Sequence, residues 1–459
     1  MLRDTYYCAK LIYGLYKLFY DETDANIASV KHAAADCGAI GQKLLQFFMM
    51  HEGFLTPECK KHFGHVFEDG ETHTWGETSA MYQEDFGEAI EDVYEISEIA
   101  PFPIGSGSIG QVYKLFHKGL NKYVAVKVKH PDVDEQASRF VRNIQRVIRT
   151  VEYVRAIPFS LLVNEFLSNI HIQLDYSLEA ENTNRMREYF SDEPLVVIPE
   201  VFQHSPRFIV MSYHEGRPYT DIQDPILKTR VSCDLYHFVI SSLLNYDFMH
   251  CDLHYGNWKV IFDESAMHEA ISNYQLVIYD CGIIAQTNNY EVSREIVCAV
   301  FDGNYLRIAD ILVPDMDNQR HGKMLRKYVV EVMKTPYTNS SDRFADIVKK
   351  ALLLGIRLDP IVLRCIQGVI TCMNIITFST NKLTKTLGKQ GNRMEVVICY
   401  NNELLKRINK FTALQKCMQD WIDNDPDIEK VFLEWLESSF GHHDVYVFMD
   451  VITQQLNLC

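Results

Sequence analysis

The sequence of 459 residues lacks several features that mark common classes of protein. Its cysteines include no CxxC pair and no histidines at zinc-finger spacing, which excludes the usual structural zinc motifs. No run approaches the roughly 20 apolar residues that a membrane-spanning helix needs. The formal net charge of -16 is not that of a general nucleic-acid binder, so we expect no nucleic-acid partner.

The amino-terminal segment has neither an uninterrupted apolar core nor a small-residue cleavage site, so no signal peptide is expected. Asp4 and the lack of an Arg- and Ser-rich extension argue against a transit peptide. Residues 1–20 are instead aromatic and amphipathic, which suits either peripheral contact with a membrane or a helix that packs on the body. With the 12 cysteines taken as reduced thiols, we expect an intracellular protein whose compartment the sequence leaves open.

Two short stretches carry the groups that phosphoryl transfer from a nucleotide needs. They are His250-Cys251-Asp252-Leu253-His254-Tyr255-Gly256-Asn257 and, after an apolar run, Asp280-Cys281-Gly282. Asp252 would orient or deprotonate the acceptor, while Asn257 and Asp280 would hold Mg²⁺. Protein kinases have these groups as HRDxxxxN and DFG, and both spacings fit. Either stretch alone also suits a turn after a strand, but the two in order favour a phosphotransferase.

A glycine-rich segment lies upstream of both stretches. The pattern GxGxxGxV, which lets backbone N–H groups approach phosphate oxygens, includes Gly105, Ser106, Gly107, Ser108, Gly110 and Val112. Strands over 112–117 and 123–129 are expected to form a hairpin there, whereas a dinucleotide-binding fold would begin a helix at once. This context predicts a site for ATP or ADP.

The second of these strands carries a lysine where protein kinases contact the α- and β-phosphates. Valines alternate to one face over 124–128 and leave Lys127 on the other, in the VAVK form of the V-A-I-K pattern. A helical region over 135–189, interrupted near 157–158, then supplies Glu179, which we predict to pair with Lys127. An exposed strand lysine and a chance charged helix face are the alternatives.

Other elements are expected as follows. Apolar spacing predicts a helical stripe from Ala28 to Met50, with Lys43 and Gln46 on one face. The remaining expectations are a loop over 64–80, a polar helix over 81–91, strands over 195–198 and 208–213, a hinge-like segment at 213–216, helices over 224–247 and 290–301, and a mostly helical remainder with a turn at 423–427 and a helix over 428–438. No APE motif closes an activation segment, so a peptide substrate lacks a docking platform.

Together these residues resemble the UbiB-type atypical kinase-like family, a group associated with coenzyme Q biosynthesis and with mitochondrial or plastid lipid metabolism. The similarity runs from about residue 27 to 310. The family's KxGQ helix corresponds to 37–46, where Lys43 and Gln46 are retained and Leu45 replaces the glycine. The resemblance implies that these two side chains fold over the nucleotide site and restrict access to it.

The family's ExD element and the glutamate that follows it correspond to Gln173, Asp175 and Glu179. In the family the first of these is a glutamate that faces the KxGQ lysine. The resemblance therefore implies that Gln173 holds Lys43 less firmly and loosens the self-blocking arrangement. The family's alanine-rich loop is Gly105-Ser106-Gly107 here, so a nucleotide preference attributed to the alanines is not expected to transfer.

The expected fold is α+β, bilobal and protein-kinase-like, with an N-terminal helical extension over the nucleotide site (1–95), a smaller lobe (96–215), and a larger lobe with a helical C-terminal region (216–459). The leading interpretation is an ATP-binding, Mg²⁺-dependent atypical kinase or ATPase acting on a small or lipid-like molecule. One alternative is a nucleotide-binding pseudokinase that regulates partner proteins, and another is a small-molecule kinase of the aminoglycoside or choline type. The complete ligand set favours an enzyme, whereas the helical lid and the missing platform favour the pseudokinase.

Overall fold

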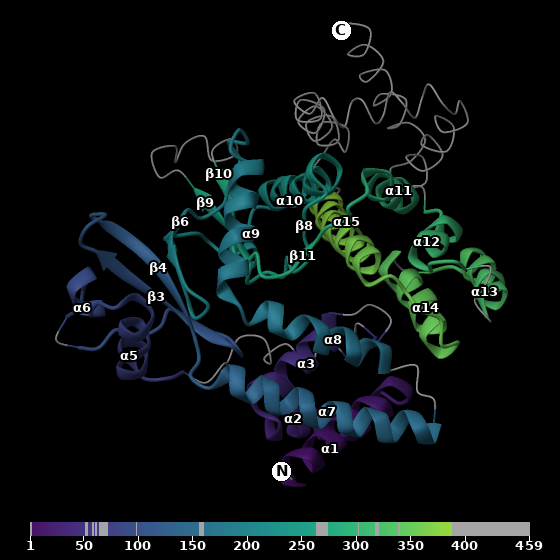
Figure 1. The fold of residues 1–459 in the computed structure, drawn as a ribbon. Helices are drawn as coiled ribbons and strands as arrows, with labels where there is room; N and C mark the ends of the chain where they lie inside the picture. Colours follow the sequence, from purple (N-terminus) through teal and green to yellow (C-terminus); the bar gives the residue numbers. More distant parts are fainter. Residues whose placement is uncertain are drawn as a thin grey trace, which may run out of the picture. The chain divides into compact units, whose positions relative to one another are not determined.

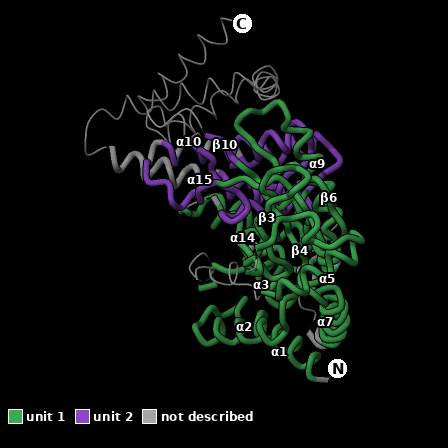
Figure 2. Tube along the Cα trace, turned by 90° about the vertical axis from the view of Figure 1, so that its left-hand side faces the viewer, with its two compact units in different colours: residues 1–215, 277–284, 313–360 green, residues 216–276, 285–312, 361–459 purple. Residues whose placement is uncertain are grey.

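A computed structural model describes residues 2–50, 54–56, 59, 62–63, 72–97, 99–155, 160–262, 274–301, 303–316, 321–337 and 340–387. The chain divides into two compact units, drawn in green and purple in Figure 2. The first unit holds 1–215, 277–284 and 313–360, and the second holds 216–276, 285–312 and 361–459. The three-part domain division expected from the sequence stays a prediction.

An antiparallel sheet lies at the centre of the first unit. Within the described residues it has six strands in the order β1-β3-β4-β7-β6, with β2 also paired to β3. These are β1 (Tyr94–Glu95), β2 (Gly105–Ser106), β3 (Gly110–His117), β4 (Lys122–Lys129), β6 (Val201–His204) and β7 (Phe208–Ser212). The register sets Lys127 opposite Val112 on one side and Ile209 on the other. The glycine-rich segment and the strand lysine therefore lie on neighbouring strands.

The alternation of residues in β4 sets the two faces of the sheet, as the sequence predicts. Val124, Val126 and Val128 are fully buried against helices α5 (Trp75–Phe86) and α6 (Ile90–Val93), which cover that face in Figure 1. Burial of one valine side chain contributes roughly 1.5–3 kcal/mol. A slip of one residue would move all three to the other face, so the register is strongly specified.

Helix α5 begins earlier than the sequence suggests. The loop expected over 64–80 is wrong for its last residues, because the helix starts at Trp75. Thr74 and Glu77 form a capping box: Glu77 N–H donates to Thr74 Oγ1 at 3.3 Å, and Thr74 N–H donates to Glu77 Oε2 at 2.8 Å. Gly87, with φ of 77°, ends the helix, so the polar helix expected over 81–91 is shifted along the chain.

Five helices of the first unit pack together beside the sheet (Figure 1), namely α1 (Leu2–Tyr20), α2 (Asp24–Asp36), α3 (Gly38–Met50), α7 (Val133–Arg155) and α8 (Ser160–Gln173). The single stripe expected from Ala28 to Met50 is wrong, because it is divided between α2 and α3. Cys37 N–H donates back to the carbonyls of Ala33 and Ala34, and Gly38 has φ of 72°. Such a left-handed conformation suits glycine and turns the chain into α3.

The helical region expected over 135–189 is divided as well. A break at Leu174 and Asp175 separates α8 from α9 (Tyr176–Tyr189). The Asp175 carboxylate caps the amino terminus of α9 and accepts a hydrogen bond from Ser177 N–H at 3.0 Å. The four-residue step from Asp175 to Glu179 in the sequence predicts one helix face, and this prediction is wrong because Asp175 is the cap that precedes α9. The interruption predicted near 157–158 lies outside the described residues.

The remaining elements of the first unit are β5 (Val196–Val197), α13 (Gly322–Lys334) and α14 (Ser340–Leu353). Gln203 and His204 lie between the strands predicted over 195–198 and 208–213, where the sequence suggests a connection, but they belong to β6 and pair with Val210 and Ile209. A register shift precedes Gln203, which breaks the alternation that would have marked the strand in the sequence.

The second unit is mainly helical. Its elements are a 3-10 helix (Tyr219–Asp221), α10 (Pro225–Tyr246), β8 (Met249–His250), β9 (Trp258–Phe262), α11 (Tyr290–Phe301), α12 (Tyr305–Leu312) and α15 (Pro360–Leu387), while β10 (Tyr274–Ile278) and β11 (Ile284–Ala285) lie at the borders of the units. The helices expected over 224–247 and 290–301 are confirmed. The turn at 423–427 and the helix over 428–438 lie outside the described residues. In the part of the chain that the structure describes, no helix combines the length and apolarity required to cross a bilayer.

Candidate active site

Three charged side chains meet on the face of the first unit's sheet that lies opposite the buried valines and is packed against α9. Lys127 Nζ donates to Glu179 Oε1 at 2.6 Å and Oε2 at 2.8 Å, and it lies 3.2 Å from Asp280 Oδ2. The side chains of Lys127 and Glu179 are 13% and 6% exposed, whereas that of Asp280 is 42% exposed. Asp280 is therefore the member of the group that a ligand reaches most readily.

Burial and charge act in opposite directions on this group. Burial by itself lowers the pKa of Lys127, but the carboxylates of Asp280 and Glu179 raise it above its ordinary value, so the lysine is charged. Burial and the neighbouring Asp280 raise the pKa of Glu179, against the opposing effect of Lys127. Lys127 is thus a buried cation held by two carboxylates. Glu179 accepts from it through both oxygens, and Asp280 accepts through one.

The backbone around Asp280 is held in a fixed form. Asp280 has φ of 55°, which is uncommon for a residue with a side chain, and Gly282 N–H donates to its Oδ1 at 3.3 Å. Asn182 on α9 donates to the Cys281 carbonyl at 3.1 Å. Cys281 is fully buried, and burial raises the pKa of its thiol to about 12. Residues 280–282 are therefore fastened to the helix that carries Glu179.

The glycine-rich segment forms a closed turn above this group. Gly107 N–H donates to the Gly110 carbonyl at 2.8 Å, and Ile104 N–H donates to the Val112 carbonyl at 2.7 Å. A Cβ atom on Gly110 would overlap the Tyr176 hydroxyl and the Val128 carbonyl oxygen, whereas none would meet an atom at Gly105. Close packing therefore requires glycine at position 110, whereas a side chain at position 105 would meet no neighbouring atom.

Tyr176 is a site residue that the sequence analysis missed. It is fully buried between the glycine-rich turn and Lys127, whose Nζ lies 4.9 Å from the ring centroid. Its hydroxyl has no hydrogen-bond partner among the described residues. The charge of Lys127 opposes the rise in the pKa of this hydroxyl that burial causes. The sequence feature that could have identified Tyr176 is its position directly after Asp175, the cap of α9.

Helix α3 brings the KxGQ-like residues toward the same group. Ser108 Oγ lies 3.4 Å from Gln46 Oε1, and Gln46 is buried. The charge of Lys43 lowers the pKa of Glu179, although no carboxylate of the described residues forms an ion pair with Lys43. Lys43 therefore influences the group electrostatically without a direct bond.

Among the described residues, neither Gln173 nor Asp175 forms a hydrogen bond or ion pair with Lys43. Gln173 is the last residue of α8, and its buried Oε1 has no hydrogen-bond partner among the described residues. Asp175 uses its carboxylate to cap α9. The gating role that the resemblance implies for these two residues stays a prediction.

The second unit holds the other motif. Asp252 is buried, its N–H donates to His250 Nδ1 at 3.2 Å, and its Oδ1 has no hydrogen-bond partner in the described residues. Asn257 Nδ2 donates to the Asp252 carbonyl at 2.8 Å, which leaves the amide oxygen for another partner. His254 Nε2 lies 4.0 Å from Asp252 Oδ2. The loop thus presents an unbonded carboxylate oxygen and an amide oxygen.

These oxygens fit what Mg²⁺ requires in nucleotide sites. Mg²⁺ is usually held by one or two carboxylates together with phosphate oxygens. Among the described residues, no cluster of three His, Cys, Asp or Glu side chains could hold a metal alone. The partly exposed Asp280 carboxylate of the first unit is a donor of the kind that such a site uses, and so is the Asn257 amide oxygen of the second unit. Cys251 and Cys281, within the motifs, are free thiols.

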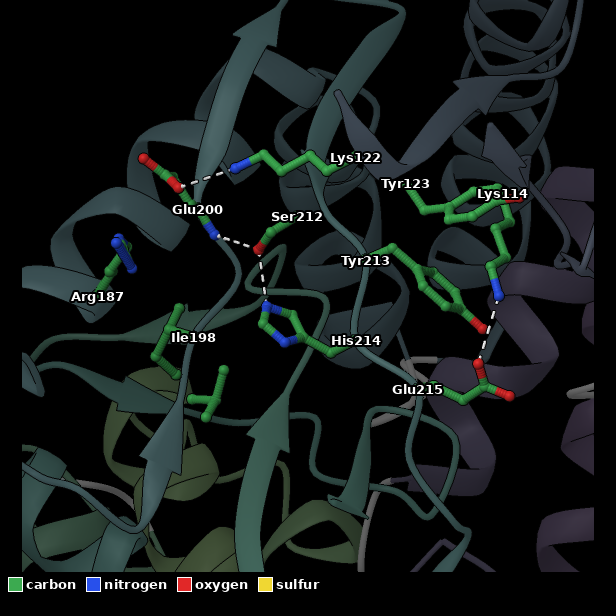
Figure 3. A pocket seen from close by; sticks show the side chains of 11 residues that line it. Lys114, Lys122, Tyr123, Arg187, Ile198, Glu200, Ser212, Tyr213, His214 and Glu215 are labelled. Atoms are coloured by element: carbon green, nitrogen blue, oxygen red, sulfur yellow. Dashed lines mark hydrogen bonds and ion pairs between the residues drawn. The ribbon is translucent and has the colours of Figure 1, made fainter. Parts of the chain in front are cut away.

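A separate pocket of about 580 Å³ lies beside the segment that leaves β7 (Figure 3). Lys114 Nζ lies 4.2 Å from the Tyr213 ring centroid and 3.3 Å from Glu215 Oε2, while Ser212 Oγ and His214 Nε2 lie 2.7 Å apart. The pocket is lined by neither Lys127, Glu179 nor Asp280. Polar and aromatic side chains, some of them from the predicted hinge-like segment, therefore line this pocket.

Comparisons with known proteins agree with this arrangement. A family model described as the ABC1 atypical kinase-like domain matches residues 68–312, more than half of the chain. The ABC1 family protein MCP2 of Saccharomyces cerevisiae is 29% identical over 268 residues, which are 55% of this chain and 46% of MCP2. The probable protein kinase UbiB of Cellvibrio japonicus is 25% identical over 317 residues, which are 66% of this chain and 56% of UbiB. The chain spans about half the length of these relatives.

Among solved structures, Rv3197 of Mycobacterium tuberculosis, in a complex with erythromycin, matches with a TM-score of 0.41 and 18% identity, covering 66% of this chain and 82% of Rv3197. The fold, a mixture of helices and sheet with amino-terminal helices, is protein-kinase-like. The resemblance seen in the sequence is confirmed by the family match: the chain belongs to the ABC1 atypical kinase-like family.

Proposed function

We propose that this protein binds ATP or ADP together with Mg²⁺ and acts as an atypical kinase or ATPase. The observation that carries the proposal is the contact of Lys127 with Glu179 and Asp280 beside the glycine-rich turn. A kinase needs a lysine held toward the α- and β-phosphates by a helix glutamate, together with an aspartate for the metal. If Lys127 served only the stability of the fold, it would not need the partly exposed carboxylate of Asp280 beside it.

Each motif residue receives a role in this proposal. The backbone of Gly105–Gly110 would cover the phosphates, and Val112 would contact the nucleotide from the neighbouring strand. Asn257 and Asp280 would hold Mg²⁺, which neutralises the phosphate charge when bound. Asp252, whose Oδ1 has no partner among the described residues, would orient the attacking water or hydroxyl. The roles of Asn257 and Asp252 rest on the motif and on the local geometry of their own loop.

We propose a small or lipid-like molecule as the phosphate acceptor. The chain after Gly282 reaches helix α11 at Tyr290, which leaves no long segment to form a peptide-docking platform. A soluble alcohol or amine, the substrate of an aminoglycoside- or choline-type kinase, is the less favoured acceptor because the chain belongs to the ABC1 family.

A nucleotide-binding pseudokinase is the second candidate. The contact between Ser108 and Gln46 favours it, because α3 then lies against the loop that must cover a nucleotide. Sustained phosphate release in the presence of Mg²⁺ separates the two functions. Release over many turnovers supports the enzyme, whereas a nucleotide-induced rise in Tm without turnover supports the pseudokinase. If the protein shows neither turnover nor a nucleotide-induced rise in Tm, both candidate functions are excluded.

We also propose peripheral contact with an anionic membrane surface through α1. Residues at alternating steps of three and four form one stripe along the helix, alternately basic and aromatic: Arg3, Tyr6, Lys10, Tyr13, Lys17 and Tyr20. Tyr6, Tyr13 and Tyr20 are 63%, 59% and 56% exposed, while the opposite face is buried in the unit. Tyrosine and basic side chains suit the headgroup region; Arg3 and Lys17 supply positive charge in a chain of net charge -16, while Lys10 is paired with Asp36 at 3.1 Å.

A further inference from the structure

Two histidines outside the proposed roles lie in contact beside the glycine-rich turn. His73 precedes α5, and His130 directly follows β4. Their Nδ1 atoms lie 2.8 Å apart, and their rings are perpendicular with centroids 5.0 Å apart. The other ring nitrogen of His130, Nε2, lies 3.0 Å from the carbonyl oxygen of Gly107. The pair therefore connects the segment before α5 to the turn.

The contact with Gly107 determines where the protons of the pair lie. A carbonyl oxygen only accepts, so His130 Nε2 carries a hydrogen, and in the neutral ring Nδ1 is an acceptor. His73 Nδ1–H then donates to that atom, which leaves His73 Nε2 to accept from Thr78 Oγ1–H at 2.8 Å. Burial and the neighbouring His130 lower the pKa of His73 to about 4, against a smaller opposing effect of Glu77. His73 is thus neutral near pH 7.

The series of hydrogen bonds continues into the sheet. The Tyr113 hydroxyl donates to Thr78 Oγ1 at 3.2 Å and accepts from Gln111 Nε2 at 2.5 Å. Gln111, which is fully buried, also accepts from His73 N–H and donates to the His73 carbonyl, each at 3.1 Å. A proton added to His73 would make its Nε2 a donor to Thr78 Oγ1, and the hydrogen of the buried Thr78 hydroxyl would then lose His73 as its acceptor.

We infer that His130 and His73 are positioning residues that hold the glycine-rich turn in the form that covers the phosphates; this inference rests on the proposed nucleotide site. The backbone of His130 contributes as well, since its N–H donates to the Ile109 carbonyl at 3.0 Å. A glycine-rich loop has many accessible conformations when free. Fixing it before the ligand arrives removes part of the ordering cost of binding.

Hydrogen–deuterium exchange of the loop amides in the full chain without nucleotide tests this inference independently of nucleotide binding. His130→Phe keeps an aromatic ring and removes the donor, so exchange over 105–112 should accelerate about three- to tenfold, the effect of losing one neutral hydrogen bond. His130→Gln, which restores an N–H donor, should return exchange toward the wild-type rate. The control His204→Phe, at an exposed position of β6, should leave it unchanged. Wild-type exchange in His130→Phe would overturn the inference.

Nucleotide affinity gives the second readout. His130→Phe should raise the Kd for ATP with Mg²⁺ about three- to tenfold, and His130→Gln should bind almost as wild type does. Should wild type itself bind no nucleotide, the proposed function fails while the exchange result still decides whether the pair holds the loop. If His130→Phe does not fold, Thr78→Val keeps the side-chain volume and removes the hydroxyl that orients His73. Faster loop exchange in that variant supports the inference, and an unchanged rate contradicts it.

Discussion

Ser108 Oγ lies 3.4 Å from Gln46 Oε1, so the glycine-rich turn touches α3 although 62 residues separate the two positions. A contact of this length is weak for a hydrogen bond to a hydroxyl group. On the other side of the turn, His130 Nε2 donates to Gly107 at 3.0 Å. The turn therefore contacts both α3, through Ser108, and the histidine pair, through Gly107, and the second of these contacts is the shorter.

Asp280→Asn should abolish Mg²⁺-dependent phosphate release, by more than about hundredfold, while the protein stays folded. The amide keeps the volume of the side chain but removes the charge that the metal requires. Far-UV circular dichroism and Tm monitor folding alongside the turnover assay. Turnover at the wild-type level in a folded Asp280→Asn protein would remove the metal assignment. Asp315→Asn, at an exposed position that also has positive φ, is a matched control.

Lys127→Met should lower the free energy of unfolding by about 3 kcal/mol at pH 8, because it leaves two carboxylates together without their cation. The deficit should shrink on acidification. The pKa of Glu179 is raised from 4.5 to about 7, so its protonated form is favoured on folding and its contribution to stability is lost as the pH rises through 7. Removal of Lys127 raises this pKa further. Urea denaturation at pH 8 and pH 5.5 measures the change, and a deficit that grows in acid would contradict the charge assignment.

Gly110→Ala should destabilise the first unit by about 1–3 kcal/mol, the usual cost of forcing an extra methyl group into a packed site. The new Cβ would overlap the Tyr176 hydroxyl and the Val128 carbonyl oxygen. Gly105→Ala, which meets no atom, should have little effect. In the double variant with Tyr176→Phe the cost should be smaller than the sum of the two single costs, because one of the overlapping atoms is gone. Additive changes in Tm would show that the overlap does not occur.

His73 should make stability depend on pH between about 4 and 6.5. The pKa of His73 falls from 6.5 in the unfolded chain to about 4 in the folded protein. Its contribution to stability is thus complete above pH 6.5 and is lost as the pH falls through 4. His73→Gln lacks this titration, so its stability should fall less than that of wild type between pH 7.5 and pH 5, as urea midpoints would record. Equal losses in the two proteins would place the titration elsewhere.

Replacing Tyr6, Tyr13 and Tyr20 by serine should weaken binding to vesicles of phosphatidylcholine and phosphatidylserine. The three rings are more than half exposed, so the fold should tolerate the change. Deletion of the whole helix is a poorer test, because Leu11, Leu15 and Leu18 of α1 are fully buried. Co-sedimentation should also weaken when salt is raised, since the basic residues contribute. Binding of wild type to neither these vesicles nor pure phosphatidylcholine would remove the proposed membrane contact.

Much of the local structure was predictable from the sequence. The β3–β4 hairpin, the face of β4 that carries Lys127, and helices α10 and α11 all follow from short-range periodicity. Three of the errors share a cause: they occur where one polar or small residue outweighs the pattern. Gly38 divides the expected helical stripe into two helices. The Thr74 cap starts α5 earlier than expected. Asp175 caps α9 because the chain leaves the helical conformation before that helix.

The sequence by itself determined which chemical groups this protein carries and in what order, because motif spacing and alternation are properties of neighbouring residues. Only the tertiary structure decided which of those groups touch. Lys127 meets Glu179 across 52 residues and Asp280 across 153, and His73 meets His130 across 57. Such contacts depend on how β4, α9 and the segment before α5 pack against one another. Packing is a collective result of the buried side chains, so no local pattern announces it.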